Sequence, residues 1–365
     1  MPAVQAQTST APARYFESLE AAFSDAADRA GLIDQTLSVG RWPVRLSFAG
    51  PELEDVVMPA LMNTAPGAPT EPAATICVFD SASSGVAVPP FTWRPADLRQ
   101  RGEVEGYNDD RFRTLYHGDV LDEEGGFDAL SMFDAESRTG VFWVSNVARV
   151  HWWERAEPLR ASLHWALNGD GRNLVHAAAV GDESGVVLIA GKGGAGKTTT
   201  TIASVLDGMR FVGDNYVLAS FEPEPVVHGL YHNVKLRPGT LELLPELESA
   251  VNSLDVAEDE KYIVDVGRWR PEQVVSGVPV RALVVPEVVG SGDTRVEPAS
   301  GIEALLALAP TTIYQLPHNG GALGAMADLA RTVPTFRLKL GGDVHGGPAA
   351  IRDLLRTVGE GQERA

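Results

Sequence analysis

The sequence predicts an α/β fold organised around a glycine-rich loop that joins a strand to a helix. Residues 191–198, GKGGAGKT, fit the pattern G-x-x-x-x-G-K-[ST]. The residues before them, 186–190, form a continuous apolar run typical of a buried strand. After the loop, Ile202, Val205 and Leu206 recur at helical spacing. Strand, loop and helix therefore follow in the order that a phosphate-binding loop requires.

This loop supplies groups that bind the phosphates of a nucleotide. Glycines let backbone N–H groups point inward, and the N-terminus of the following helix favours an anion. Lys197 is predicted to reach the β- and γ-phosphates, and the Thr198 hydroxyl to bind Mg²⁺. The alternative is a glycine-rich turn without a ligand. The predicted nucleotide-binding residues are Gly191, Lys192, Gly193, Gly194, Ala195, Gly196, Lys197, Thr198 and Thr199.

Composition narrows the class of protein. The chain has 365 residues, 44% of them apolar, which favours a globular protein of two domains. Its net charge of −19 argues against nucleic acid and anionic membranes as partners. Cys77 is the single cysteine, so no disulfide framework is expected. The first residues show no leader pattern, and we expect a cytoplasmic protein.

We divide the chain into a flexible tail at 1–14, an N-terminal α+β domain at 15–155 and a P-loop domain at 156–365. The N-terminal domain is predicted to hold antiparallel strands, because the runs 130–133 and 141–144, joined across Arg138-Thr139-Gly140, are typical of a hairpin. Two further strands and one helix are expected there, at 44–48, 75–79 and 15–23.

The P-loop domain is predicted to alternate strands and helices. His176 lies within an expected strand at 173–180, and Asp214 follows an expected strand at 210–212. A capping box at Ser300 and Glu303 opens a helix. Other strands are expected at 216–218, 261–266, 280–285 and 336–340, other helices at 158–167, 241–247 and 322–332 and from 348, and an acidic loop at 255–260.

A P-loop leaves hydrolysis, switching and phosphoryl transfer open. No NKxD or LSGGQ segment is present, so neither a GTPase switch nor an ABC ATPase is supported, and Asp343 starts a DxxG pattern by letters alone. The segments His176-Ala-Ala-Ala-Val180 and Phe211-Val-Gly-Asp214-Asn215, with the loop between them, resemble the HPr kinase/phosphorylase family and related bacterial serine kinases of the phosphoenolpyruvate-carboxykinase superfamily. Asp214 follows Lys197 by 17 residues, which is similar to the family's spacing.

The resemblance covers residues 170–358 and implies a P-loop kinase domain of the HPr-kinase/carboxykinase type that uses ATP and Mg²⁺. It implies that Asp214 is the catalytic acid/base and shares the metal with Thr198, and that His176 contacts phosphate or supports Asp214. Asn215 stands where the family commonly has a second acidic residue, which argues against the reverse, phosphorylase-type reaction. Cationic candidates for the transferred phosphate or the acceptor are Lys235, Arg237, Lys261 and Arg268.

Structural roles remain open for these residues: a strand-end turn for Asp214, core packing for His176 and solvated strand ends for the cations. The expected reaction is phosphorylation of a hydroxyl on a protein, a peptide or a small molecule, with self-association of the chain. Lys192 also fits the KGGxGKT loop of ParA/MinD-like ATPases, which is one alternative. A nucleotide-binding sensor without catalysis is another, because the second carboxylate is missing.

Overall fold

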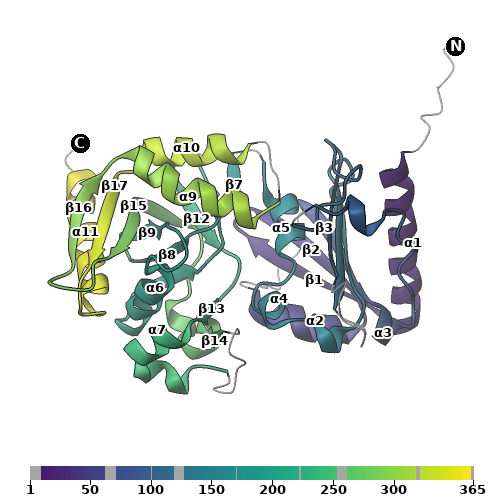
Figure 1. The fold of residues 1–365 in the computed structure, drawn as a ribbon, viewed down its shortest axis with the longest axis horizontal. Coiled ribbons are helices and arrows are strands. Elements are labelled where there is room, and N and C mark those ends of the chain that lie inside the picture. The colour runs from purple at the N-terminus through teal and green to yellow at the C-terminus, as the bar shows by residue number, and fades with distance from the viewer. Residues whose placement is uncertain are drawn as a thin grey trace, which may run out of the picture.

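The computed structural model describes residues 10–61, 71–99, 101–118, 127–169, 171–221, 223–252, 261–317 and 321–362. Within them the chain forms a mixed α/β fold with one large sheet in each half of the molecule (Figure 1). The predicted tail lies partly outside this description, and its residues 11–14 belong to a helix. The acidic loop predicted at 255–260 lies outside the described residues.

The N-terminal sheet has six strands in the order β1-β2-β3-β6-β5-β4. Contrary to the prediction of antiparallel strands alone, β2 pairs with β3 and β3 with β6 in parallel. A parallel pair needs a crossover, and α2 (Pro51–Val57) lies on the connection from β2 to β3. The predicted hairpin of β5 and β6 is confirmed. The strands are β1 (Leu32–Val39), β2 (Trp42–Ala49), β3 (Ala74–Asp80), β4 (Phe112–Gly118), β5 (Asp128–Asp134) and β6 (Thr139–Val144).

Helices cover both faces of this sheet. The 20-residue helix α1 (Ala11–Ala30) buries Phe16 and Leu19 in a cluster with Phe79 and Trp143. The opposite face packs against α2 and α5 (Arg160–Leu167). The predicted helix start at Pro158 is two residues early, because Leu159 has φ +58° and the helix begins after it.

The second sheet has nine strands. Its main path is β10-β8-β9-β15-β12-β11-β7, and β17 joins β15 in parallel and β16 in antiparallel orientation. The strands are β7 (Arg172–Val175), β8 (Ala178–Asp182), β9 (Gly185–Ile189), β10 (Arg210–Gly213), β11 (Val217–Ser220), β12 (Val226–Gly229), β15 (Val278–Val288), β16 (Arg295–Ala299) and β17 (Thr335–Leu340).

The strand predicted at 173–180 is in fact two strands. It breaks at His176, where the Ala177 N–H donates to the Val175 carbonyl in a tight turn at 3.1 Å. β7 then pairs with β11, whereas β8 pairs with β9 and β10. An apolar run does not show where a chain changes neighbours within a sheet, because both pieces are buried.

Two pairs of helices cover this sheet. α6 (Lys197–Leu206) and α11 (Gly346–Gln362) share one core cluster, and α9 (Gly301–Gln315) and α10 (Ala322–Thr332) share another. The capping box at Ser300 is confirmed, since its hydroxyl accepts from the Glu303 N–H at 3.3 Å. Beside α6 lies a small sheet of β13 (Asn233–Leu236) and β14 (Tyr262–Asp265), with α7 (Pro238–Leu243). The short helices are α3 (Ser81–Ser84), α4 (Trp152–Ala156) and α8 (Val266–Trp269).

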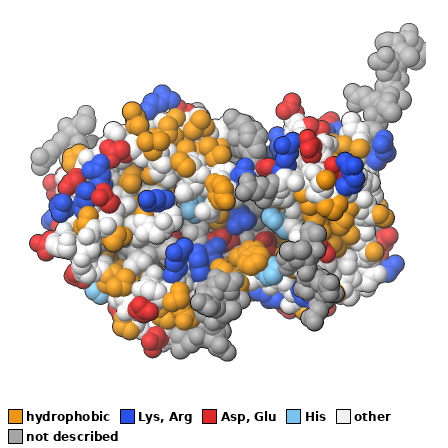
Figure 2. All heavy atoms as spheres, viewed as in Figure 1, with side chains coloured by type: hydrophobic (Ala, Val, Ile, Leu, Met, Phe, Trp, Pro, Cys, Tyr) orange, Lys and Arg blue, Asp and Glu red, His pale blue; other side chains and the backbone are white. Residues whose placement is uncertain are grey.

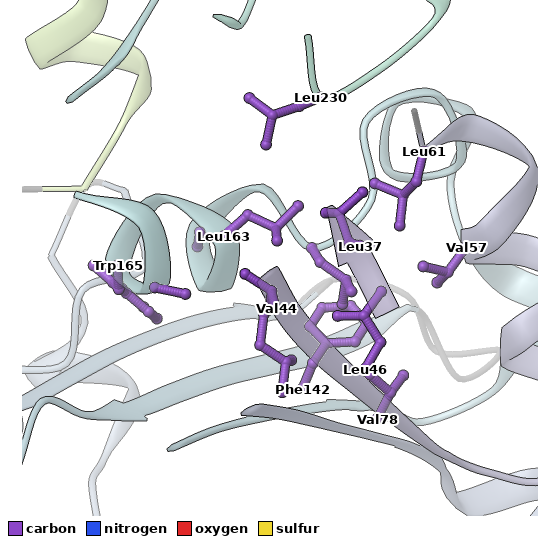
Figure 3. Packing of buried hydrophobic residues seen from close by; sticks show 14 of the residues in the cluster. Leu37, Val44, Leu46, Val57, Leu61, Val78, Phe142, Leu163, Trp165 and Leu230 are labelled. Carbon is purple, nitrogen blue, oxygen red and sulfur yellow. The ribbon is translucent and has the colours of Figure 1, made fainter. Parts of the chain in front are cut away.

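The two halves share one apolar core. Leu163 and Trp165 of α5 belong to a cluster with Leu37 and Phe142 of the first sheet and with Leu230, which follows β12 (Figure 3). The predicted boundary between residues 155 and 156 falls within α4 (Trp152–Ala156) and shortly before α5, the helix that packs on both halves. Within the described part of the chain, no helix combines the length and apolarity that a membrane crossing requires.

Candidate functional site

The glycine-rich loop lies between the buried strand β9 and the start of α6. Gly194 and Gly196 have φ of +80° and +101°, a region that glycine adopts without steric cost. A Cβ atom on Gly196 would also lie 2.6 Å from Leu340 Cδ1. The backbone conformation at position 196 therefore favours glycine, and a larger residue there would also displace the Leu340 side chain of β17.

Lys197 begins α6 and is 6% exposed. Its Nζ donates to the Gly191 carbonyl at 2.6 Å, so the ammonium lies within the curve of the loop. Burial lowers the pKa of Lys197, and the charge of Asp214 opposes this shift. A cation held at low dielectric at the N-terminus of a helix is suited to neutralise phosphate oxygens.

Asp214 follows β10 and contacts the first turn of α6. Its Oδ2 accepts from the Thr198 hydroxyl at 3.0 Å, and the residue is fully buried. Its Oδ1 has no hydrogen-bond partner among the described residues. Burial raises the pKa of Asp214, while Thr198 and Lys197 oppose the shift. The hydroxyl and the unpaired carboxylate oxygen are ligands that Mg²⁺ prefers, so these residues fit that ion.

His176 lies at the break between β7 and β8 and lines the same cleft. Its backbone N–H donates to the Thr312 hydroxyl at 2.9 Å. Its imidazole ring packs on the ring of Tyr216, with 5.4 Å between the two centroids. Burial, followed by the charge of Lys197, lowers the pKa of His176 to about 3. The imidazole is therefore neutral at neutral pH and does not add a positive charge to the cleft.

Asn215 binds a carboxylate that the sequence analysis missed. The Asn215 Nδ2 donates to Glu157 Oε1 at 2.8 Å, and Asn215 has φ +68°. Glu157 is 1% exposed, and its Oε2 pairs with Lys235 at 2.6 Å and with Arg160 at 3.8 Å. An aspartate at position 215 would set two carboxylates against each other, whereas asparagine supplies an amide donor.

Most predicted cations gather around a cleft of about 570 Å³. Lys192, Lys197, Lys235, Arg237 and Lys261 line it, as does Arg160, which was not predicted. Figure 2 shows Lys and Arg side chains in hollows of this half and where the two halves meet. Six cations around one cavity stand out in a chain of net charge −19, and they favour an anionic ligand.

Arg268 is not part of this group. It lies exposed on α8, where its N–H donates to Asp265 Oδ1 at 2.9 Å, and it does not line the cleft. Arg268 thus lies in the first turn of α8, and Asp265 is the N-cap residue of that helix. The sequence could not separate it from Lys261, because both flank the same strand.

Apolar side chains also line the cleft. Val288 and Leu340 lie against Gly196, and Leu243 and Val344 are further lining residues. Apolar side chains beside a phosphate-binding loop are suited to a nucleotide base.

Glu157 is a residue of the site that sequence reasoning missed. It is joined to Asn215 across 58 positions, so local spacing carries no signal for it.

Comparisons with known proteins do not assign a family. No family model matches the chain, and no curated protein matches it. A structure of the Hpr(Ser) kinase/phosphatase from Coxiella burnetii is similar over 52% of this chain and 99% of that chain, with 14% sequence identity and a TM-score of 0.27. A similarity at this level establishes neither relationship nor activity.

Proposed function

We propose that the chain is an ATP- and Mg²⁺-dependent phosphotransferase of the HPr kinase-like type that phosphorylates a hydroxyl group. The observation that carries the proposal is the bond from Thr198 to the buried Asp214, whose second oxygen is unpaired. The carboxylate thus lies directly beside the phosphate-binding loop. Phosphoryl transfer depends on positioning and charge neutralisation, and both need a carboxylate at this place.

In the proposed reaction the loop and Lys197 hold the triphosphate, and Thr198 and Asp214 would hold the metal, which would neutralise charge on the phosphates. The acceptor oxygen bonds to the γ-phosphorus, the bond from that phosphorus to the bridging oxygen breaks, and ADP leaves. Asp214 accepts the hydroxyl proton.

The leading acceptor is a Ser or Thr hydroxyl of a protein or peptide, and a small hydroxyl compound is the second. Lys235, Arg237 and Lys261 are proposed to bind the transferred phosphate or the acceptor. Charge supports an acceptor site here, because these three cations line the same cleft as the phosphate-binding loop. We also propose that the chain self-associates, which sedimentation velocity would test.

A ParA/MinD-like ATPase is less well supported. That reading requires a long apolar strand ending in paired aspartates, whereas β10 has four residues and leads to Asp214 and Asn215. Lys192 is exposed on the loop and is compatible with either reading.

The test is transfer from [γ-³²P]ATP with Mg²⁺, with and without free serine, candidate peptides and cell extract. Label on an acceptor supports the proposal, free phosphate alone supports the ATPase, and binding without either supports a sensor. Asp214→Ala should abolish transfer while Asp353→Asn, an exposed carboxylate on α11, leaves it unchanged. Intact transfer by Asp214→Ala would show that Asp214 is not the base.

A further inference from the structure

A buried carboxylate outside the P-loop cleft contacts three residues that line it. Glu157 is 1% exposed and is not among the residues that line the cleft. Its Oε1 accepts from Asn215 Nδ2 at 2.8 Å, and its Oε2 lies 2.6 Å from Lys235 Nζ and 3.8 Å from Arg160 Nη1. Asn215, Lys235 and Arg160 all line the cleft. An effect of Glu157 on a reaction in the cleft would therefore pass through these neighbours.

Fold stability alone is a poor explanation for this carboxylate. Replacing both members of a buried ion pair by apolar side chains is often neutral or stabilising, whereas removing one member leaves a buried charge without its partner. A carboxylate that receives a donor on each oxygen also fixes the direction of both donors. The contacts of Glu157 therefore indicate that it positions groups of the cleft.

The bond to Asn215 acts on the turn that carries Asp214. The Tyr216 N–H donates to the Asp214 carbonyl at 3.0 Å, so residues 214–216 form a tight turn with Asn215 at its centre. Asn215 has φ +68°, a conformation that is costly for a residue with a Cβ atom. Its side chain is tied to Glu157, so the turn is held from outside the cleft. Glu157 thereby helps to fix the backbone next to the proposed base.

The contact with Lys235 fixes one of the cations of the cleft. A lysine ammonium lies at the end of a flexible four-carbon stem and has three N–H donors. The Lys235 side chain is 10% exposed, and its Nζ is held 2.6 Å from the Glu157 carboxylate. A cation that is fixed before the phosphate arrives needs no reorganisation during the transfer.

Glu157 is itself held in place by the segment that leads into β13. It lies between α4 and α5, in the stretch that joins the two halves of the molecule. The hydroxyl of the buried Tyr231 donates to the Pro158 carbonyl at 2.9 Å, next to the contact of Lys235 with Glu157. The joining stretch is therefore fastened to the P-loop half by its backbone as well as by the carboxylate.

We propose that Glu157 is a positioning residue for the transfer reaction. Its carboxylate fixes the Asn215 amide beside Asp214 and orients the Lys235 ammonium for the transferred phosphate. This proposal rests on the proposed phosphotransferase function and adds a residue that touches neither the nucleotide nor the acceptor. The bonds formed and broken in the transfer stay the same, and Glu157 exchanges no proton.

The test compares Glu157→Gln with Glu154→Gln in the full chain. Glutamine at 157 keeps an oxygen that accepts from Asn215 and removes the charge opposite Lys235. Glu154 is the matched control on α4, because its Oε1 accepts from the Leu159 N–H at 3.0 Å and it does not line the cleft. Label transfer from [γ-³²P]ATP with Mg²⁺ to free serine, or to the best-labelled peptide of a Ser/Thr library, gives kcat and KM. A fluorescent ADP analogue gives the nucleotide Kd.

A positioning role predicts a loss of rate without a loss of nucleotide binding. Glu157→Gln should lower kcat at least about 10-fold and leave the Kd of the ADP analogue within about threefold, because a misplaced group slows transfer more than it weakens binding. Glu154→Gln should leave kcat unchanged. A general loss of structure would instead weaken nucleotide binding and transfer together.

Two further variants separate positioning from stability. Glu157→Gln should lower the unfolding temperature, and adding Lys235→Met should bring it back up, because the double variant removes both members of the pair. The kcat should stay as low as in Lys235→Met alone. Glu157→Asp keeps the charge and shortens the side chain, so it should also lower kcat, and it serves if Glu157→Gln does not fold.

The outcomes separate the two proposals. No transfer by the unaltered chain contradicts the proposed function, and this inference with it. Transfer by the unaltered chain together with an unchanged kcat in Glu157→Gln, or in Glu157→Asp if the former does not fold, leaves the phosphotransferase in place and overturns the positioning role. A double variant that regains kcat along with its unfolding temperature would overturn it as well.

Discussion

At the scale of single residues, the site is governed by buried charge. Asp214 and Glu157 are both almost inaccessible, yet their environments differ. Glu157 is matched by Asn215 and Lys235, whereas Asp214 has one hydroxyl donor and an unpaired oxygen. A buried charge that is not fully paired costs stability, and such residues often serve function.

The first prediction concerns Asp214→Asn. Burial raises the pKa of Asp214, so ionisation opposes folding as the pH rises through that pKa. The amide avoids this cost. The variant without nucleotide should therefore unfold at a higher temperature at pH 8, by about 1–2 °C for each kcal/mol of stability gained in a chain that unfolds as one unit. The gain should shrink in acid, where the native carboxyl is protonated. Transfer should fall at least about 100-fold.

Differential scanning calorimetry from pH 5 to pH 8 measures this effect, with Asp353→Asn as the control on an exposed carboxylate. A lower unfolding temperature for the Asp214 variant at pH 8 would mean that the carboxylate stabilises the fold.

The second prediction concerns the pair of Asn215 and Glu157. Asn215→Asp sets a carboxylate against Glu157 Oε1, where the amide now donates at 2.8 Å. Asn215→Asp with Glu157→Gln restores one donor and one acceptor. The double variant should therefore lose less free energy of unfolding than the two single variants lose in sum. The difference should be about 0.5–3 kcal/mol, measured by urea unfolding. Simple additivity would show that the two side chains do not interact.

At the scale of secondary-structure elements, the end of α9 links the two halves. The Thr312 hydroxyl accepts from His176, Gln315 accepts from Tyr216, and carbonyls of the last turn accept from Arg101. A cation at a helix C-terminus binds carbonyls that have no partner within the helix. Through this contact, the position of Gln315, which lines the candidate site, depends on the N-terminal half.

The third prediction tests that link with Arg101→Met. Amide hydrogen exchange in the last turn of α9 should become faster, and the free energy of unfolding should fall by about 1 kcal/mol. Arg99→Met is the matched control, since Arg99 forms an exposed pair with Glu105 at 2.8 Å. Its removal should cost at most about 0.5 kcal/mol. Unchanged exchange in α9 after loss of Arg101 would exclude the linkage.

At the scale of the whole molecule, both sheets share the core that α5 fills. Leu163 is fully buried in a cluster with residues of the first sheet and with Leu174 and Leu218 of the second. Halves that share a core are expected to unfold together. The 156–365 segment alone would expose the side of α5 that packs on the first sheet.

The fourth prediction follows for Leu163→Ala. Loss of a fully buried leucine should cost about 2–5 kcal/mol. Calorimetry should show one transition that moves down as a unit. Leu243→Ala, at an exposed leucine of α7, is the control for stability. It is not a control for activity, because Leu243 lines the cleft. Two transitions, of which one moves, would show that the halves are independent.

The sequence by itself determined the elements with strong local signals. The strand, loop and helix around Lys197, the capping box at Ser300 and the hairpin of β5 and β6 were predicted, because backbone geometry, caps and turns are set by near neighbours. Asp214 was singled out by its spacing from Lys197, and the structure brings it within 3.0 Å of Thr198.

Only the tertiary structure decided which distant segments meet. The parallel pairs of the first sheet, the break at His176, the ion pair that joins Glu157 to Lys235 and a small cavity lined by Arg101 and Arg160 join residues far apart in the chain. Periodicity shows that a residue is buried but not against what, because many partners bury the same apolar area. Strand order and the pairing of buried charges are set by the packing of the whole chain.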